Sequence, residues 1–231
     1  MTKLIVANWK SNHNKHSAIE WLNKVNSFLQ EKENNLSLVL APPFPILSAV
    51  GDIVEANGIK LAVQDLSQFS AGSYTGAVCA DNLQDLGINY AILGHSERRR
   101  YFQETDEVVA QKVQQALEAN INPVLCLDEP YLESQLKVLQ ETTQEKEKLQ
   151  NSLVIAYEPL QAIGTGQSED PEHVGQIVAQ VKATYQVPVL YGGSVNSENV
   201  SQFLAVSDGV LVGSASLEAD SFIFLLQSAQ S

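Results

Sequence analysis

Short apolar runs alternate with longer amphipathic segments along the whole chain. The runs have the length of buried strands, and the segments between them repeat apolar residues every three or four positions, as helices do. The expected strands are residues 4–7, 38–41, 59–63, 90–93, 121–127, 153–157, 187–190 and 209–212. The expected helices are residues 18–29, 46–56, 105–119, 131–149, 172–185, 199–204 and 219–228.

This alternation determines the predicted fold class. Strands that alternate with helices pair in parallel, and a set of eight closes on itself as a (β/α)8 barrel. No linker, low-complexity tract or change of composition divides the chain. We therefore predict an α/β protein, a single-domain TIM barrel over residues 1–231 with eight parallel strands ringed by helices. The long irregular segment at residues 64–78 is expected to be functional.

Composition and charge narrow the possible partners. The chain of 231 residues has 27 acidic and 14 basic residues and a net charge of −13. Such a field repels nucleic acid and anionic membrane surfaces, so neither is expected as a partner. No apolar run is long enough to cross a membrane, and the first residues lack a secretory signal pattern. We expect a cytoplasmic protein.

Two cysteines, Cys79 and Cys126, are too few and too far apart for a disulfide framework. Neither lies in a CxxC or CxxH pattern, so a zinc site is not expected. Cys126 lies within an apolar run and is interpreted as a small buried side chain.

Glu158 stands at the end of the apolar run 153–157. Pro159 ends the strand, and Gly164 and Gly166 give the next loop a backbone that moves freely and brings its N–H groups close to an anion. A carboxylate where a core strand opens into a mobile loop suits a catalytic base with a lid beside it. The alternative is a surface glutamate followed by an ordinary glycine-rich turn.

Other strand ends supply further polar groups. In a (β/α)8 barrel the active site lies at the carboxyl ends of the strands. The first strand leads to Asn8 and Lys10, and the fourth leads to His95 and Glu97. A buried Lys10 requires an anion, for which Glu97 and the substrate are candidates. His95 precedes the expected first turn of a helix, where positive potential favours a neutral imidazole; the alternative is an ordinary core histidine.

Small residues follow the last two strands. Gly192-Gly193-Ser194 and Gly213-Ser214 lie where such barrels often hold phosphate on backbone N–H groups, and Gly164 can close over the same anion. The alternative is plain turn chemistry. A carboxylate base, a neutral donor, a fixed cation and a phosphate site suit proton transfer between adjacent carbons of a small phosphorylated carbonyl compound. This chemistry needs no metal and no cofactor.

The whole chain resembles a known family, the triosephosphate isomerases, through five groups of sequence motifs. The motifs occur in the family's order: Ala7-Asn8-Trp9-Lys10, Gly94-His95-Ser96-Glu97-Arg98-Arg99, Ala156-Tyr157-Glu158-Pro159 with Ala162-Ile163-Gly164-Thr165-Gly166, Tyr191-Gly192-Gly193-Ser194-Val195, and Asp208-Gly209 with Leu211-Val212-Gly213 and Ala215-Ser216-Leu217. The resemblance implies interconversion of dihydroxyacetone phosphate and D-glyceraldehyde 3-phosphate, in glycolysis and gluconeogenesis.

The resemblance also implies residue roles. Glu158 would be the proton-shuttling base and His95 the electrophile, with Lys10 and Asn8 stabilising negative charge and Glu97 completing the set as the partner of Lys10. The substrate-binding residues would be Asn8, Lys10, Gly164, Ser194, Gly213 and Ser214. The 64–78 loop resembles the family's dimer-forming loop, with Thr75-Gly76 at its tip, so the implied state is a homodimer.

Several positions depart from the family pattern. Gln161 stands where a tryptophan is usual, Gln167 where a lysine is usual, and Ala77 where a glutamate is common. The segment between the fifth and sixth strands is shorter than the family norm. An alternative function is a phosphate-binding scaffold with slow or lost turnover. An aldolase-like barrel would need a Schiff-base lysine near the middle of the barrel or a metal cluster, and neither is found in the sequence.

Overall fold

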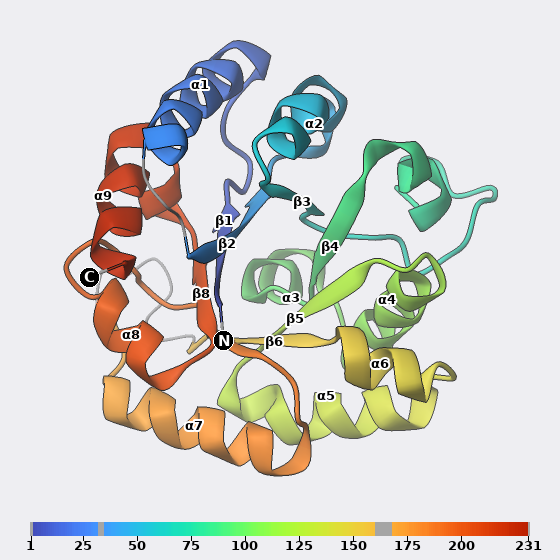
Figure 1. Cartoon of the computed structure of the whole chain (residues 1–231). Helices are drawn as coiled ribbons and strands as arrows, with labels where there is room; N and C mark the ends of the chain where they lie inside the picture. Colours follow the sequence, from blue (N-terminus) through green and yellow to red (C-terminus); the bar gives the residue numbers. More distant parts are fainter. Residues whose placement is uncertain (1, 32–34, 160–167, 231) are drawn as a thin grey trace.

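The computed structural model describes residues 2–31, 35–159 and 168–230. Within these residues eight parallel strands form one closed barrel in the order β1 to β8 (Figure 1). The strands are β1 (Lys3–Asn8), β2 (Leu36–Ala41), β3 (Lys60–Val63), β4 (Ile88–Leu93), β5 (Asn122–Leu127), β6 (Val154–Tyr157), β7 (Val189–Tyr191) and β8 (Gly209–Val212). Each overlaps an expected strand, and the predicted (β/α)8 fold class is confirmed.

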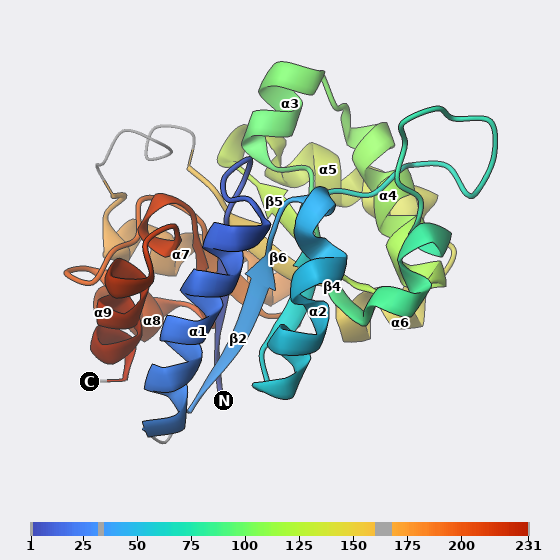
Figure 2. The same cartoon turned by 90° about the horizontal axis from the view of Figure 1, so that it is seen from above.

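Helices surround the barrel (Figures 1 and 2). They are α1 (Lys15–Glu31), α2 (Leu47–Ala56), α3 (Ser96–Phe102), α4 (Asp106–Glu118), α5 (Glu129–Thr142), α6 (Lys146–Ser152), α7 (Pro171–Thr184), α8 (Val200–Val206) and α9 (Ala219–Ala229). Short 3-10 helices lie at η1 (Phe44–Ile46), η2 (Ala80–Leu86) and η3 (Ser214–Ser216). No helix among the described residues has the length and apolar character needed to span a membrane.

One helix prediction was wrong. Residues 131–149 were expected to form a single helix, but α5 ends at Thr142 and α6 begins at Lys146. The backbone of Thr143 is extended, with φ −71° and ψ 125°. The interruption lets Leu149 on α6 turn into the core, as Leu132, Leu136 and Leu139 of α5 do.

The core has two layers because successive strand residues point to opposite faces. On β1, Leu4 and Val6 face the barrel interior, whereas Ile5 and Ala7 face the helices. The interior cluster consists of Leu4, Val6, Val39, Ala41, Ala62, Ile92, Val124, Cys126, Val154, Ala156, Leu190 and Leu211. These side chains fill the barrel, so a polar site is possible only at its ends.

We predict that Gly209→Ala destabilises the barrel where β8 closes on β1. The alanine Cβ would lie 2.0 Å from the carbonyl oxygen of Leu4, which is backbone and has no rotamer to change. The cost should be roughly 3 kcal/mol of unfolding free energy or more, because overpacking forces the backbone to shift. Urea unfolding monitored by circular dichroism measures it.

The matched control is Gly175→Ala on α7, where the new Cβ meets its nearest atoms, on Val206, at 3.5 and 3.6 Å. This change should stabilise the protein by about 0.5–1 kcal/mol, since alanine favours helix and restricts the unfolded chain. Equal stability of Gly209→Ala and the parent protein would contradict the close contact between β1 and β8.

Candidate functional site

A cavity of about 390 Å³ opens at the carboxyl ends of the strands. Its lining comes from residues distant in sequence. Asn8 ends β1 and Lys10 follows it, His95 follows β4, Glu158 follows β6, Gly192 to Asn196 follow β7, and Leu211 and Gly213 to Ala215 belong to or follow β8. The structure therefore brings most of the predicted site residues together at one end of the barrel, where (β/α)8 enzymes hold their active sites.

Lys10 is fixed in an unusual backbone conformation. Its φ is +52°, a left-handed value that costs energy for a residue with a side chain. Two amide side chains stabilise it: the backbone N–H of Lys10 donates to Asn8 Oδ1 at 3.0 Å, and Gln64 Nε2 donates to the carbonyl of Lys10 at 2.9 Å. The Lys10 ammonium meets Glu97 Oε1 at 2.5 Å, so the predicted ion pair is confirmed.

His95 is the N-cap residue of α3, as the sequence predicted. Its Nδ1 accepts a hydrogen bond from the backbone N–H of Glu97 at 3.2 Å. A ring nitrogen that accepts carries no proton, so this contact assigns a neutral imidazole with its proton on Nε2. The side chain is 8% exposed, and Nε2 lies 3.2 Å from Glu158 Oε1. The neutral ring thus presents one donor toward the cavity.

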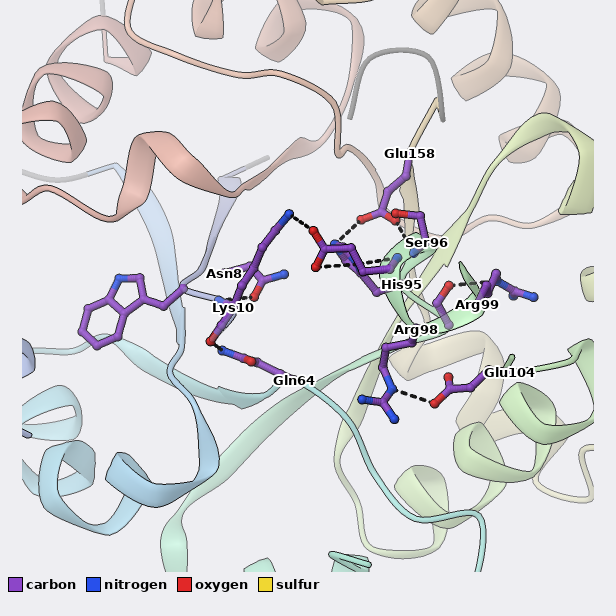
Figure 3. Close-up of polar contacts among 12 residues, drawn as sticks. Asn8, Lys10, Gln64, His95, Ser96, Arg98, Arg99, Glu104 and Glu158 are labelled. Atoms are coloured by element: carbon purple, nitrogen blue, oxygen red, sulfur yellow. Dashed lines mark hydrogen bonds and ion pairs between the residues drawn. The ribbon is translucent and has the colours of Figure 1, made fainter. Parts of the chain in front are cut away.

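Glu158 is held by two groups that follow the end of β4 (Figure 3). Its Oε2 accepts from the backbone N–H of Ser96 at 3.1 Å, and its Oε1 faces His95. The residue is only 2% exposed. Cys126 belongs to the apolar cluster that fills the barrel interior; burial raises the pKa of its thiol well above the usual value, and the charge of Glu158 adds to the shift. The thiol therefore stays protonated.

The small-residue loops after β7 and β8 form the other side of the cavity. The carbonyl of Ser216 accepts from Trp9 Nε1 at 3.2 Å and from Trp21 Nε1 at 3.0 Å, which ties η3 to the end of β1 and to α1. The Tyr191 hydroxyl accepts from the backbone N–H of Glu169 at 2.9 Å, and its ring stacks on Phe203. The tryptophans thus anchor the loop after β8, and Tyr191 packs against the loop after β7, where a Cβ at Gly193 would lie 2.1 Å from its hydroxyl oxygen.

Seven of the predicted site residues line the cavity: Asn8, Lys10, His95, Glu158, Ser194, Gly213 and Ser214. Glu97 is not among the lining residues and is joined to the cavity through its ion pair with Lys10. Gly164, Gln161 and Gln167 lie in residues 160–167, outside the described part of the chain. Among the described residues, no group of three or more His, Cys, Asp or Glu side chains is arranged to hold a metal ion.

Several contributors were missed by the sequence analysis. Gln64 clamps Lys10, the Ser96 N–H holds Glu158, and the Cys126 thiol lies within reach of the charge of Glu158. Ser96 acts through its backbone, so its residue type gives no signal. Gln64 could have been suspected from its place directly after the third predicted strand.

This arrangement favours proton transfer at carbon. A carboxylate shielded from water accepts a proton, a neutral N–H donor stabilises an adjacent oxygen, and an ammonium group supplies positive charge to the same space. The backbone N–H groups of the glycine-rich loops suit a small anion such as a phosphate group.

Comparisons with known proteins agree with this geometry. A model of the family described as Triosephosphate isomerase matches residues 3–229. The chain is 41% identical to the triosephosphate isomerase of Mesomycoplasma hyorhinis, over 96% of this chain and 97% of that protein. It is 37% identical to that of Delftia acidovorans, over 99% of both chains, and 38% identical to that of Thermus thermophilus, over 98% of both.

We predict that Gly192→Ala displaces the Glu158 carboxylate from His95. The alanine Cβ would lie 2.8 Å from Glu158 Cγ, closer than carbon atoms approach. The hydrogen bond from His95 Nε2 should break, and the ¹⁵N chemical shift of that nitrogen reports the loss. Gly51→Ala on α2, whose nearest contacts are 3.8 Å or longer, is the control. An unchanged His95 spectrum in the Gly192 variant would mean that the site accommodates the methyl group.

Proposed function

This chain belongs to the triosephosphate isomerase family, and from that premise we propose that its cavity interconverts dihydroxyacetone phosphate and D-glyceraldehyde 3-phosphate. The family makes the chain an intramolecular isomerase. One observation supports the proposal for the site most strongly. Glu158 Oε1 lies 3.2 Å from the protonated Nε2 of a neutral His95, in a cavity that Lys10 also lines.

Glu158 would be the base. The carboxylate removes a proton from the carbon next to the substrate carbonyl and returns it to the former carbonyl carbon. The hydroxyl proton passes from one substrate oxygen to the other through Nε2 of His95, so both residues end in the protonation state in which they began. Before substrate binds, Glu158 Oε1 lies at the Nε2–H of His95. A substrate oxygen that takes over this donor releases Oε1 for proton abstraction. The buried setting favours transfer, because little water competes for the carboxylate.

His95 and Lys10 would stabilise the enediolate formed in between. The Nε2–H of His95 donates to the oxygens whose charge changes during the reaction, and the ammonium of Lys10 supplies a fixed positive charge. Asn8 and Gln64 hold the backbone of Lys10, and Glu97 holds its ammonium group. Asn8 also lines the cavity and would contact substrate directly.

The substrate phosphate would lie against the loops after β7 and β8. Ser194, Gly213 and Ser214 line that side of the cavity, and Lys10 packs beside Gly213. Neutral backbone N–H groups suit an anion in a protein whose own charge is −13, because they add local donors without a surface cation cluster. Gly164 stays a predicted further donor, outside the described residues.

The whole chain would act as one catalytic domain in the cytoplasm, in glycolysis and gluconeogenesis. Cys79 and Cys126 are both free and buried, which suits a reducing compartment. The alternative of a phosphate-binding scaffold gains no support, because a binding site alone has no use for a shielded carboxylate aimed at a neutral imidazole.

We predict that Glu158→Asp lowers kcat by about 100-fold or more, because the side chain loses one methylene and the carboxylate retracts from the reacting carbon. The inhibition constant of inorganic phosphate should stay within about twofold, since the loops that hold phosphate are untouched. A coupled assay with D-glyceraldehyde 3-phosphate measures both constants. Glu133→Asp on the exposed face of α5 is the control. An unchanged kcat would remove Glu158 from the mechanism.

We also propose that the enzyme is a homodimer formed through the 64–78 loop. The loop extends away from the barrel beyond β3 (Figure 2) and exposes the stacked rings of Phe69 and Tyr74. Tyr101 and Phe102 of α3 are about two-thirds exposed, at 65% and 66%. Large aromatic side chains left in solvent are typical of surfaces that a partner covers.

A partly buried group of four charged residues links the base of this loop to the neighbouring helices. Asp65 pairs with Arg98 at 2.8 Å and with Lys112 at 2.6 Å, and Glu104 pairs with both cations. Burial raises the pKa of the Asp65 carboxyl group, while Lys112 and Arg98 oppose that shift. The pairs link the loop to α3 and α4, so the loop would meet a second copy in a defined position.

We predict that Tyr74→Asp converts the dimer into a monomer, because it places a charge in an interface that must exclude water. Light scattering should give a mass of about 25.2 kDa for the variant and about twice that for the parent protein. Phe224→Asp, on the equally exposed face of α9, should stay dimeric. A parent protein of monomeric mass would end this part of the proposal.

A further inference from the structure

The side chain of Arg99 lies against the turn that carries His95. Arg99 is on α3, and its Nε donates to the carbonyl of Gly94 at 2.9 Å. The side chain is 9% exposed and is absent from the cavity lining. Figure 3 shows Arg99 next to His95, on the side opposite Lys10. Arg99 therefore contacts the backbone of the catalytic turn from behind.

The turn at Gly94 is tightly constrained. Gly94 has φ +69°, and a Cβ there would lie 2.9 Å from a methyl carbon of Val109 and 3.0 Å from Arg99 Nη2. The Gly94 carbonyl belongs to the same peptide group as the nitrogen of His95. The His95 carbonyl accepts from the backbone N–H groups of Arg98 and Arg99, at 2.8 and 3.1 Å. Both peptide groups of His95 are thus held, one of them by the side chain of Arg99.

The guanidinium group is itself anchored by two outer helices. Arg99 Nη1 donates to Asp106 Oδ1 at 2.8 Å, and Nη2 donates to Gln135 Oε1 at 2.5 Å. Gln135 is fully buried and donates to the carbonyl of Asp106 at 3.0 Å. Ser134 donates to the other carboxylate oxygen of Asp106 at 2.6 Å. The direction in which Nε points at Gly94 is therefore set by α4 and α5.

We infer that Arg99 is a positioning residue for His95. By holding the Gly94–His95 peptide group, it fixes the origin of the imidazole, so that Nδ1 meets the Glu97 N–H and Nε2–H points at Glu158 and the substrate oxygens. The rigid, planar guanidinium reaches the Gly94 carbonyl and both anchors at once; a lysine ammonium is a single point and loses this geometry. The inference rests on the proposed role of His95.

The test is Arg99→Lys, which keeps the positive charge opposite Asp106. We expect kcat for D-glyceraldehyde 3-phosphate to fall about tenfold or more while KM stays within about twofold, because a misdirected imidazole weakens the transition state and leaves the phosphate contacts intact. The ¹⁵N spectrum of the His95 ring, assigned by its absence in His95→Gln, should change from one Nε2–H tautomer to a mixture.

The matched control is Leu139→Ala, also on α5. It removes a fully buried apolar side chain and destabilises the packing of the same helix, but it leaves every hydrogen bond of Arg99 in place. We expect a loss of Tm at least as large as that of Arg99→Lys, with kcat within about twofold of the parent protein and an unchanged His95 spectrum. If kcat falls in step with Tm in both variants, Arg99 is only a structural link and the inference is overturned.

Chemical rescue provides a second measurement. In Arg99→Ala, ethylguanidinium at a concentration that does not denature the protein should restore kcat several-fold and restore the single His95 tautomer, whereas ethylammonium should not. Equal effects of the two cations would contradict the inference. If the parent protein had no isomerase activity, the proposed function would fail, yet the His95 spectrum would still decide whether Arg99 positions the ring.

Discussion

The hydrogen bond from the Glu97 N–H to His95 Nδ1 determines what this site can do. An imidazole that accepts at Nδ1 is neutral and has one proton to offer, on the nitrogen that faces the cavity. If both nitrogens carried protons, the ring would be a cation bound to Glu158, and the ion pair would hold the carboxylate that we propose as the base. The start of α3 immediately after His95 is what makes Nδ1 an acceptor, so a short helix outside the barrel sets the protonation of a group inside the cavity.

The closed barrel brings side chains that are distant in sequence together at one site. Glu158 and Ser96 are 62 positions apart in sequence, yet their contact is 3.1 Å, and Lys10 and Glu97 are 87 positions apart and form an ion pair. Each residue stands directly at or after a strand end, and the parallel arrangement sends all strand ends to one rim. The apolar side chains that fill the interior keep water out beneath them.

The order of the strands and most of the residues that line the cavity could be predicted from the sequence, because both are indicated by short local patterns. Strands appeared as short apolar runs, and Asn8, Lys10, His95 and Glu158 followed those runs directly. The break between α5 and α6 was missed because residues 143–145 contain no glycine or proline, and the buried position of Leu149 decides it. Arg99 was missed because it stabilises a backbone carbonyl brought near by folding, and no residue pattern indicates such a contact. Gln64 also binds a backbone carbonyl, and only its place directly after the third predicted strand could have drawn attention to it.

The shared carbonyl of Ser216 has a further consequence. The chain has two tryptophans, and the indole N–H groups of both donate to this one oxygen, directly behind the loop at Gly213 and Ser214. Indole emission depends on the polarity and hydrogen bonding around the ring, so any occupant that shifts this loop acts on both fluorophores together. Under the proposed placement of the phosphate group, the two tryptophans would report anion binding by their own emission, and titrations would need no attached dye.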